Sequence, residues 1–312
     1  MEIINKQAIE ANLPDMSTLI AIIKQCYIDY SDKKYVVPPV GHMPLPNGEL
    51  HIKYGISHVQ KYAAIKIASG SYTNHEIGLP NSYGCIMVIN ADTGFPEYML
   101  QDEGILTDHR TAAAGALMAQ TMIGDNSERT FGIVGCGIQG YFQSVYTCHA
   151  LGINQVLAYD IKSENIQSLK EQLAKHDIEV VPCKSIKALC ESCDVITTVT
   201  PATSGYIIYD WLKPNVHINA FGCDTEGKQE LTENVLQHAS LILADSLAQC
   251  SHHGELQYLY NDRSQQHIKR KSTEFGTFLK DQAGFSTSGL TIADFTGIAP
   301  QDIAIANAVI KQ

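Results

Sequence analysis

The sequence predicts an α/β protein: a doubly wound parallel sheet, preceded by an α+β domain. Two patterns carry this prediction. From about residue 131 onward, short apolar runs alternate with helical stretches, as parallel strands do with their crossover helices. Between Tyr35 and Gly94, Pro and Gly instead punctuate β-rich runs such as ELHIKYG, YAAIKIA and YGCIMVIN, which indicates hairpins or a meander.

The composition limits the function classes. At 312 residues the chain is long enough for two domains, and 45% hydrophobic with 18% charged residues is a globular balance. A net charge of −11 disfavours nucleic acid and anionic membranes as partners. No run approaches the roughly 18 apolar residues of a membrane span, and the N-terminus has no signal-peptide pattern. We expect a cytoplasmic protein whose nine cysteines are mostly reduced, and no metal site from the isolated CxxC at Cys190 and Cys193.

The first elements can be placed from periodicity. Apolar residues at helical spacing predict a helix within residues 1 to 30, ahead of the β-rich segment. After that segment, Thr107 is the expected N-cap of an Ala-rich helix from about Asp108 to Ile123. Arg110 lies near this helix N-terminus, where the helix dipole and a guanidinium both favour an anion. The alternative is that Arg110 pairs with a surface acid such as Asp108.

A glycine motif follows the polar linker GDNSERT. In FGIVGCGIQG, three glycines (Gly135, Gly137 and Gly140) match G-x-G-x-x-G between an apolar strand and a helix, and the next strand ends at Asp160, twenty residues after Gly140. This context predicts a Rossmann dinucleotide site. Asp160 can accept both ribose hydroxyls and would repel a 2′-phosphate, so NAD is favoured over NADP. Lys162 and Ser163 just beyond it keep NADP open.

Further strands are expected at IEVVP, DVITTVTP, HINAFG and SLILAD. Ligands bind at the carboxyl ends of such parallel strands. Thr200 and the run Gly222–Asp224 stand at two of these ends. Asp224 therefore has two interpretations: it faces a reacting amine near the nicotinamide, or it caps the next helix.

These motifs together resemble the ornithine cyclodeaminase/μ-crystallin family. The resemblance rests on Lys66 in AAIKIASG, on GLP and TGFP, and on LTDHRTAAAGAL, GIVGCGIQG, TTVTPA, GCDTEGKQEL and DFTGIAPQD. It covers nearly the whole chain in the family's order. LT-x-x-RTAA together with G-x-D-x-x-GK-x-EL is far more specific than the nucleotide fingerprint.

The resemblance implies a homodimer with a substrate-binding and dimerisation domain at residues 1–125, a Rossmann domain at 126–289, and a tail, 290–312, that returns to the first domain. Lys66 and Arg110 look like ligands of the substrate carboxylate, and Asp224 like the acid that handles the substrate nitrogen. The alternative for Lys66 is that its side chain only extends from a sheet face to solvent. The cofactor contacts would include the three glycines and Ile138, Gln139, Asp160, Thr200, Phe221, Gly222, Cys223 and Lys228.

Two positions depart from the family. Cyclodeaminases carry an Arg, another carboxylate ligand, before the Lys66 strand, whereas VVPPVGHMP has none and places Gly41 and His42 there. Lys53 could replace that charge, so Lys53 and His42 join the candidate substrate ligands. Phe295 stands where a family cofactor contact is often Ser.

The expected function is NAD(P)H-dependent reduction of a small cyclic ketimine, with Δ1-pyrroline-2-carboxylate to L-proline as first candidate. Asp224 would stabilise the iminium while Arg110 and Lys66 hold the carboxylate near the hydride donor. The first alternative is ornithine cyclodeamination, which yields L-proline and ammonia with NAD recycled. Further alternatives are an alanine-type amino-acid dehydrogenase and a non-catalytic, μ-crystallin-like ligand binder.

Overall fold

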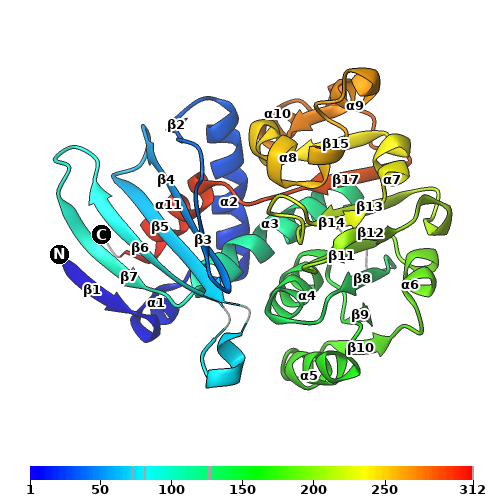
Figure 1. Ribbon diagram of the computed structural model, residues 1–312, viewed down its shortest axis with the longest axis horizontal. Coiled ribbons are helices and arrows are strands. Elements are labelled where there is room, and N and C mark those ends of the chain that lie inside the picture. Colours follow the sequence, from blue (N-terminus) through cyan, green and yellow to red (C-terminus); the bar gives the residue numbers. More distant parts are fainter. Residues whose placement is uncertain (72, 81, 125–127, 311–312) are drawn as a thin grey trace. The chain divides into compact units, whose positions relative to one another are not determined.

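The computed structural model of the protein describes residues 1–71, 73–80, 82–124 and 128–310 (Figure 1). The chain forms two compact units. The first comprises Met1–Arg110 together with the described residues from Ile298 onward, and the second comprises Thr111–Gly297. Among the helices in these described ranges, none is both long enough and apolar enough to span a membrane.

The first unit contains a seven-stranded sheet in the order β1-β7-β6-β5-β4-β2, with β3 also paired to β4. From β3 to β7 each strand runs antiparallel to the next, and β1 adds a parallel edge. The meander expected in this segment is therefore present. The strands are β1 (Glu2–Asn5), β2 (Tyr35–Val36), β3 (Gly41–Leu45), β4 (Gly48–Ser57), β5 (Tyr62–Ser71), β6 (Ser82–Asn90) and β7 (Pro96–Gln101).

Helices α1 (Lys6–Asn12), α2 (Met16–Ser31) and α11 (Ala299–Val309) complete this unit. The N-terminal helical segment is split, because Pro14 interrupts it and Asp15 starts α2 by accepting a hydrogen bond from the Thr18 amide at 2.9 Å. Helix α11 packs on β4 and β5. Alternate strand residues face it and are buried, as Ala64 and Lys66 show.

The second unit contains an eight-stranded sheet in the order β10-β9-β8-β11-β13-β17-β15-β16, with every pair parallel. A parallel sheet covered on both faces requires continuous apolar strands, and most of its strands are fully buried. The strands are β8 (Phe131–Val134), β9 (Gln155–Tyr159), β10 (Glu179–Pro182), β11 (Val195–Thr198), β13 (Val216–Ala220), β15 (Leu241–Ala244), β16 (Ser272–Glu274) and β17 (Leu290–Asp294). The predicted doubly wound α/β architecture is confirmed.

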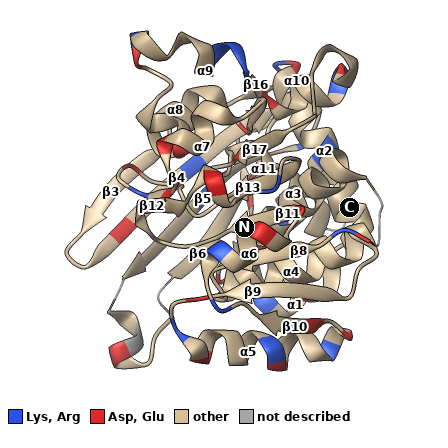
Figure 2. Ribbon diagram, turned by 90° about the vertical axis from the view of Figure 1, so that its right-hand side faces the viewer, with Lys and Arg blue, Asp and Glu red and all other residues tan. Residues whose placement is uncertain are grey.

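Besides most of α3 (Ile105–Ile123), this unit contains the helices α4 (Ile138–Leu151), α5 (Ser163–Leu173), α6 (Ile186–Ser192), α7 (Glu233–His238), α8 (Leu247–His253), α9 (Gln266–Arg270) and α10 (Phe275–Lys280). A small pair, β12 (Thr203–Ile207) and β14 (Gln229–Leu231), lies outside the main sheet. In the view of Figure 2, acidic and basic segments are mixed along α5 rather than gathered by sign.

The boundaries between the two units differ from those expected at 125/126 and 289/290. Strand β17 lies between β13 and β15, so residues 290–294 belong to the Rossmann sheet and not to a returning tail. At the other boundary, α3 (Ile105–Ile123) is one continuous helix, and the division falls within it, after Arg110. Residues 125–127 of the expected linker lie outside the described residues.

Helix α3 also begins earlier than expected. Its first residue is Ile105, and the Asp102 carboxylate accepts a hydrogen bond from the Leu106 amide at 3.2 Å. Thr107 is consequently inside the first turn rather than at the N-cap. Its hydroxyl instead accepts a hydrogen bond from Lys66.

Candidate functional site

A buried charged cluster occupies the first unit. Lys66 on β5 and Arg110 on α3 both approach Asp302 on α11: the Lys66 Nζ–Asp302 Oδ1 distance is 2.8 Å and the Arg110 Nε–Asp302 Oδ1 distance is 3.3 Å. The exposed fractions of the three residues are 2%, 5% and 1%. Lys66 also donates to Thr107 Oγ1 at 3.2 Å. The structure thus brings the two predicted carboxylate ligands together, and Lys66 does not snorkel to solvent.

Part of this cluster has unused hydrogen-bonding capacity. Arg110 Nη1 donates to Gln301 Oε1 at 3.3 Å. Within the described part of the chain, however, the buried Arg110 Nε–H donates no hydrogen bond, and the buried Asp302 Oδ2 accepts none. Buried polar groups normally have hydrogen-bond partners, so this cluster retains capacity to bind a polar ligand.

Burial and the neighbouring charges shift two ionisations in this cluster. Burial lowers the pKa of Lys66 to about 7; the attraction of Asp302 opposes this, and repulsion from Arg110 and Lys53 adds to it. Burial favours the neutral form of Asp302, but attraction from Lys66, Arg110 and Lys53 together holds its pKa below the usual value. The cluster therefore keeps a carboxylate ionised beside cations that are costly to bury.

Lys53 supplies the third positive charge. It lies directly opposite Lys66 in the β4–β5 ladder, which places both side chains on the same sheet face. His42, in contrast, is on β3 opposite His51, and its ring lies beside Glu49 with an Nε2–Oε2 distance of 3.8 Å. No contact between His42 and the Lys66 cluster is found among the described residues.

Asp302 was not among the residues predicted from the sequence. Its neighbours on α11, APQDIAIANAV, are mostly apolar. A single carboxylate in such a buried helix requires a cationic partner. The isolated Asp302 in an apolar helix could therefore have indicated a buried ion pair.

In the second unit the glycine turn has the expected geometry. Gly135 has φ +97°, a conformation that disfavours any side chain, and a Cβ at Gly140 would collide with the Gly135 carbonyl. A Cβ at Gly137 would meet no atom within 4 Å. That open backbone is where a pyrophosphate can approach the start of α4, whose first residue is Ile138.

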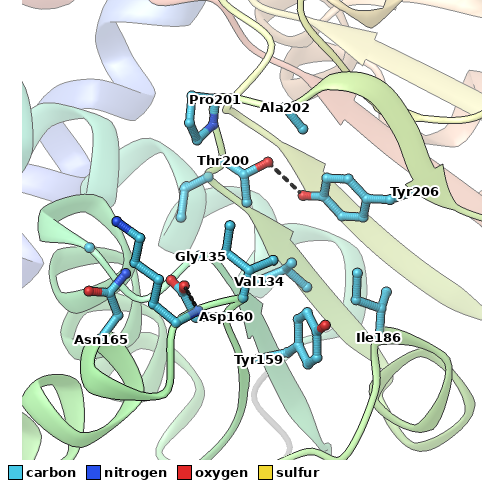
Figure 3. A pocket seen from close by; sticks show the side chains of 14 residues that line it. Val134, Gly135, Tyr159, Asp160, Asn165, Ile186, Thr200, Pro201, Ala202 and Tyr206 are labelled. Carbon is cyan, nitrogen blue, oxygen red and sulfur yellow. Dashed lines mark hydrogen bonds between the residues drawn. The ribbon is translucent and has the colours of Figure 1, made fainter. Parts of the chain in front are cut away.

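Asp160, directly after β9, is fixed beside this turn. Its Oδ2 accepts a hydrogen bond from the Cys136 amide and its Oδ1 one from the Lys162 amide, both at 2.8 Å. A cavity of about 490 Å³ adjoins it. Figure 3 shows Asp160 and Asn165 on one side of this cavity and Thr200 and Pro201 on the other. Lys162 also lines this cavity.

A second hollow, of about 230 Å³, shares Thr200 and Pro201 with the first. The predicted residues that line it are Gln139, Thr200, Phe221, Gly222, Asp224 and Lys228. Cys223 does not line either cavity: it is fully buried, and its thiol donates to the Lys228 carbonyl at 2.9 Å. Burial also raises the pKa of this thiol.

Asp224 does not cap the next helix. Helix α7 begins at Glu233 with Thr232 as its N-cap. The Asp224 carboxylate instead accepts a hydrogen bond from Lys228 Nζ at 2.7 Å, and the Asp224 side chain is 47% exposed. Of the two interpretations of Asp224, the helix-cap alternative is therefore wrong.

The buried Glu230 organises the strand ends around this hollow. Like Asp302, it was not among the residues predicted from the sequence. It accepts hydrogen bonds from the hydroxyls of Thr198, Thr200 and Tyr206 at 2.6, 2.7 and 2.8 Å, and from the amides of Thr200 and Gly222 at 2.7 and 2.9 Å. Burial raises its pKa, while these donors act in the opposite direction. The ends of β11 and β13 are held by this one carboxylate.

Comparison with known proteins decides the family. The family model described as "Ornithine cyclodeaminase/mu-crystallin family" matches residues 9–312. The chain belongs to this family. Among ornithine cyclodeaminase/mu-crystallin relatives, the alanine dehydrogenase of Archaeoglobus fulgidus is 30% identical over 315 residues, covering 98% of this chain and 93% of the relative.

Two solved structures of similar proteins share the whole fold. An archaeal alanine dehydrogenase dimer with bound NAD superposes with a TM-score of 0.88 at 28% identity, covering 99% of this chain and 94% of that one. The Δ1-pyrroline-2-carboxylate reductase of Thermococcus litoralis, in complex with NADH and L-proline, gives a TM-score of 0.86 at 21% identity, covering 99% and 96%.

One departure from the ornithine cyclodeaminase/mu-crystallin pattern has a structural counterpart. Phe295, at the position where a Ser is expected, is 5% exposed and stacks on Phe221 with ring centroids 5.2 Å apart. It therefore contributes packing behind a predicted cofactor contact rather than a hydroxyl.

Proposed function

We propose that this protein reduces the C=N bond of a small α-imino acid, with the cyclic ketimine Δ1-pyrroline-2-carboxylate as the first candidate substrate and L-proline as its product. The observation that carries the proposal is the buried Lys66–Asp302–Arg110 cluster, in which two cations share one carboxylate and the Arg110 Nε–H donates no hydrogen bond. A substrate carboxylate can accept that hydrogen bond and offset the excess positive charge. The family's nicotinamide cofactor fits the open backbone at Gly137 and the adjoining cavity.

Each of the candidate site residues has a distinct role in the proposed reaction. Arg110 and Lys66 orient the substrate carboxylate, and Lys53 supplies the charge that the family's missing Arg would have given. Asp224, held by Lys228, stabilises positive charge on the imine nitrogen, which makes the neighbouring carbon more electrophilic. When bound, the reduced nicotinamide supplies the hydride that adds to this carbon.

The cofactor preference we propose is NAD(H) over NADP(H). Both oxygens of Asp160 already accept backbone hydrogen bonds, which fixes a negative charge where the adenosine ribose binds in Rossmann sites. A carboxylate in that place can still accept from the ribose hydroxyls and repels a 2′-phosphate.

The second candidate reaction is alanine-type dehydrogenation, in which the imine is open-chain. The favouring observation is the 30% identity with an alanine dehydrogenase over 98% of this chain. The same three cations would then hold the carboxylate of a smaller substrate.

We also propose a homodimer formed through the sheet of the first unit. The sheet face opposite α11 is apolar, and its side chains are half-buried or exposed; it includes Ile52, Tyr54, Ile65, Ile67, Cys85 and Met87. Tyr54 and Ile67 are each 37% exposed. An exposed apolar patch marks an interaction surface, two-fold dimers use the same surface on both copies, and a solved relative is described as a dimer.

The test is an absorbance assay at about 340 nm, where the reduced nicotinamide absorbs. With Δ1-pyrroline-2-carboxylate, NADH should be consumed in proportion to product. Pyruvate with ammonia tests the alanine-type reaction, and L-ornithine with NAD, followed by ammonia release, tests cyclodeamination. Binding of NADH without turnover of any substrate would contradict an enzymatic function.

Variants test the carboxylate site in the same assay. Arg110→Lys keeps the charge but loses the planar fork, so kcat/KM should fall by roughly tenfold or more. Arg129→Lys is the matched control, because Arg129 is 40% exposed in an ion pair with Asp194. Equal kinetics for both variants would remove Arg110 from the substrate site.

A further inference from the structure

We propose that His42, Glu49 and His51 form a binding site for a divalent transition-metal ion on the β3–β4 hairpin. The three residues offer two imidazole nitrogens and one carboxylate oxygen, all within 4.8 Å of one another. Two His and one carboxylate are a ligand set that suits Zn²⁺ and its neighbours Co²⁺ and Ni²⁺.

The backbone delivers the three side chains to one face. His42 and His51 are direct partners in the antiparallel β3–β4 ladder, so their side chains project to the same side. Glu49 precedes His51 by two residues on β4, which places it on that side as well. The connection from Leu45 to Gly48 has two residues, and so short a hairpin loop fixes this register.

The distances are close to those that a metal needs. A tetrahedral ion about 2.0–2.1 Å from each ligand holds neighbouring ligand atoms about 3.3 Å apart. The Glu49 Oε2 atom is 3.1 Å from His51 Nε2 and 3.8 Å from His42 Nε2, and the two rings have centroids 4.9 Å apart. The side chain of His42 is 47% exposed, so it has room to close the remaining gap.

Three protein ligands leave a fourth position on the ion for water or for an anion. Lys53 follows His51 by two residues on the same face of β4. A bound divalent cation would therefore add positive charge to the face that carries the Lys53–Lys66 pair. This site goes beyond the proposed reaction and does not depend on it.

The competing explanation is that the two imidazoles contact only Glu49 and bind no ion. Such a surface contact contributes little to stability, and metal would not strengthen it. The two explanations therefore differ in a direct binding measurement.

The experiment titrates Co²⁺ into the full-length, untagged protein after removal of metals with a chelator, followed by calorimetry and visible absorption. We expect one Co²⁺ per chain with a dissociation constant on the order of 1 μM, displaced by Zn²⁺. His51→Ala and Glu49→Gln should each weaken binding by at least roughly 100-fold. His58→Ala, an exposed histidine just beyond the end of β4, is the matched control and should bind as the wild type does.

A second readout separates a lost ligand from a lost fold. Binding to the native state alone raises the melting temperature. Co²⁺ should therefore raise the melting temperature of the wild type and of His58→Ala, and leave that of His51→Ala unchanged. If His51→Ala fails to fold, the exposed His42→Ala replaces it.

Two results would overturn the proposal. One is the absence of stoichiometric Co²⁺ binding to the wild type. The other is binding that survives His51→Ala but is lost in the double variant His252→Ala/His253→Ala, whose adjacent rings lie on α8 with centroids 6.4 Å apart.

Discussion

Lys66 Nζ and Asp302 Oδ1 are 2.8 Å apart although 236 residues separate them in the sequence. Both side chains are at most 3% exposed. Removing one member of a buried ion pair leaves the other charge without compensation, which is far more costly than the pair itself is stabilising.

Replacement of Asp302 should therefore destabilise the fold. We expect Asp302→Ala to lower the free energy of unfolding by about 3–5 kcal/mol, as measured by urea denaturation near neutral pH. Asp92→Ala, at an exposed turn, is the control and should change it by less than about 0.5 kcal/mol. A loss below about 1 kcal/mol in Asp302→Ala would show that the cations at Lys66 and Arg110 are compensated in another way.

Carboxylate binding should weaken as the pH rises through the pKa of Lys66. That pKa is lowered to about 7, so Lys66 is cationic below this pH and increasingly neutral above it. The inhibition constant of a small saturated carboxylate without a nitrogen, such as cyclopentanecarboxylate, should rise between pH 6 and pH 9, roughly in inverse proportion to the cationic fraction of Lys66. Using a carboxylate without nitrogen avoids the titration of the imine.

The control is Lys66→Arg, because a guanidinium stays charged over this range. Its inhibition constant should be independent of pH, whatever its absolute value. A wild-type profile that is flat between pH 6 and pH 9 would count against Lys66 as a ligand of the carboxylate.

Asp224→Asn tests the role of the negative charge, because it removes the charge and keeps the shape of the side chain. We expect kcat to fall by roughly 10²-fold, the scale of losing one preorganised electrostatic group, while cofactor affinity and melting temperature stay near wild type. The stability should survive because the side chain is half-exposed and caps no helix. Asp210→Asn, also exposed, is the control. Near-normal turnover in Asp224→Asn would remove this carboxylate from the chemistry.

Asp160→Ala should erode the preference for NADH over NADPH. The substitution removes the negative charge beside the ribose position and leaves Lys162, which lines the same cavity, to attract a 2′-phosphate. Affinities for both cofactors can be measured by fluorescence titration. If the wild type already binds NADPH much more tightly, Lys162 rather than Asp160 sets the choice. Lys162→Ala should then lower NADPH affinity alone.

Local sequence was sufficient for the dinucleotide turn, because Gly135 is required by its own φ of +97° and Gly140 by the nearby carbonyl of Gly135. It was insufficient for the boundary near residue 290, since nothing in LTIAD reveals that its strand inserts between β13 and β15. The ion pair between Lys66 and Asp302 could not be predicted either, because it also joins elements that are distant in the sequence. Thr107 was expected to cap α3 because a hydroxyl precedes an Ala-rich run, but the more distant Asp102 performs that role.

The position of α11 in the chain sets an order of assembly during synthesis. The ribosome makes Lys66 and Arg110 early, then the entire sheet of the second unit, and only afterwards Asp302. Domains generally fold as they emerge, N-terminal first. Here the second unit, a continuous stretch, can complete its core while the first still lacks the helix that covers β4 and β5. We therefore expect the first unit to complete its core after the second.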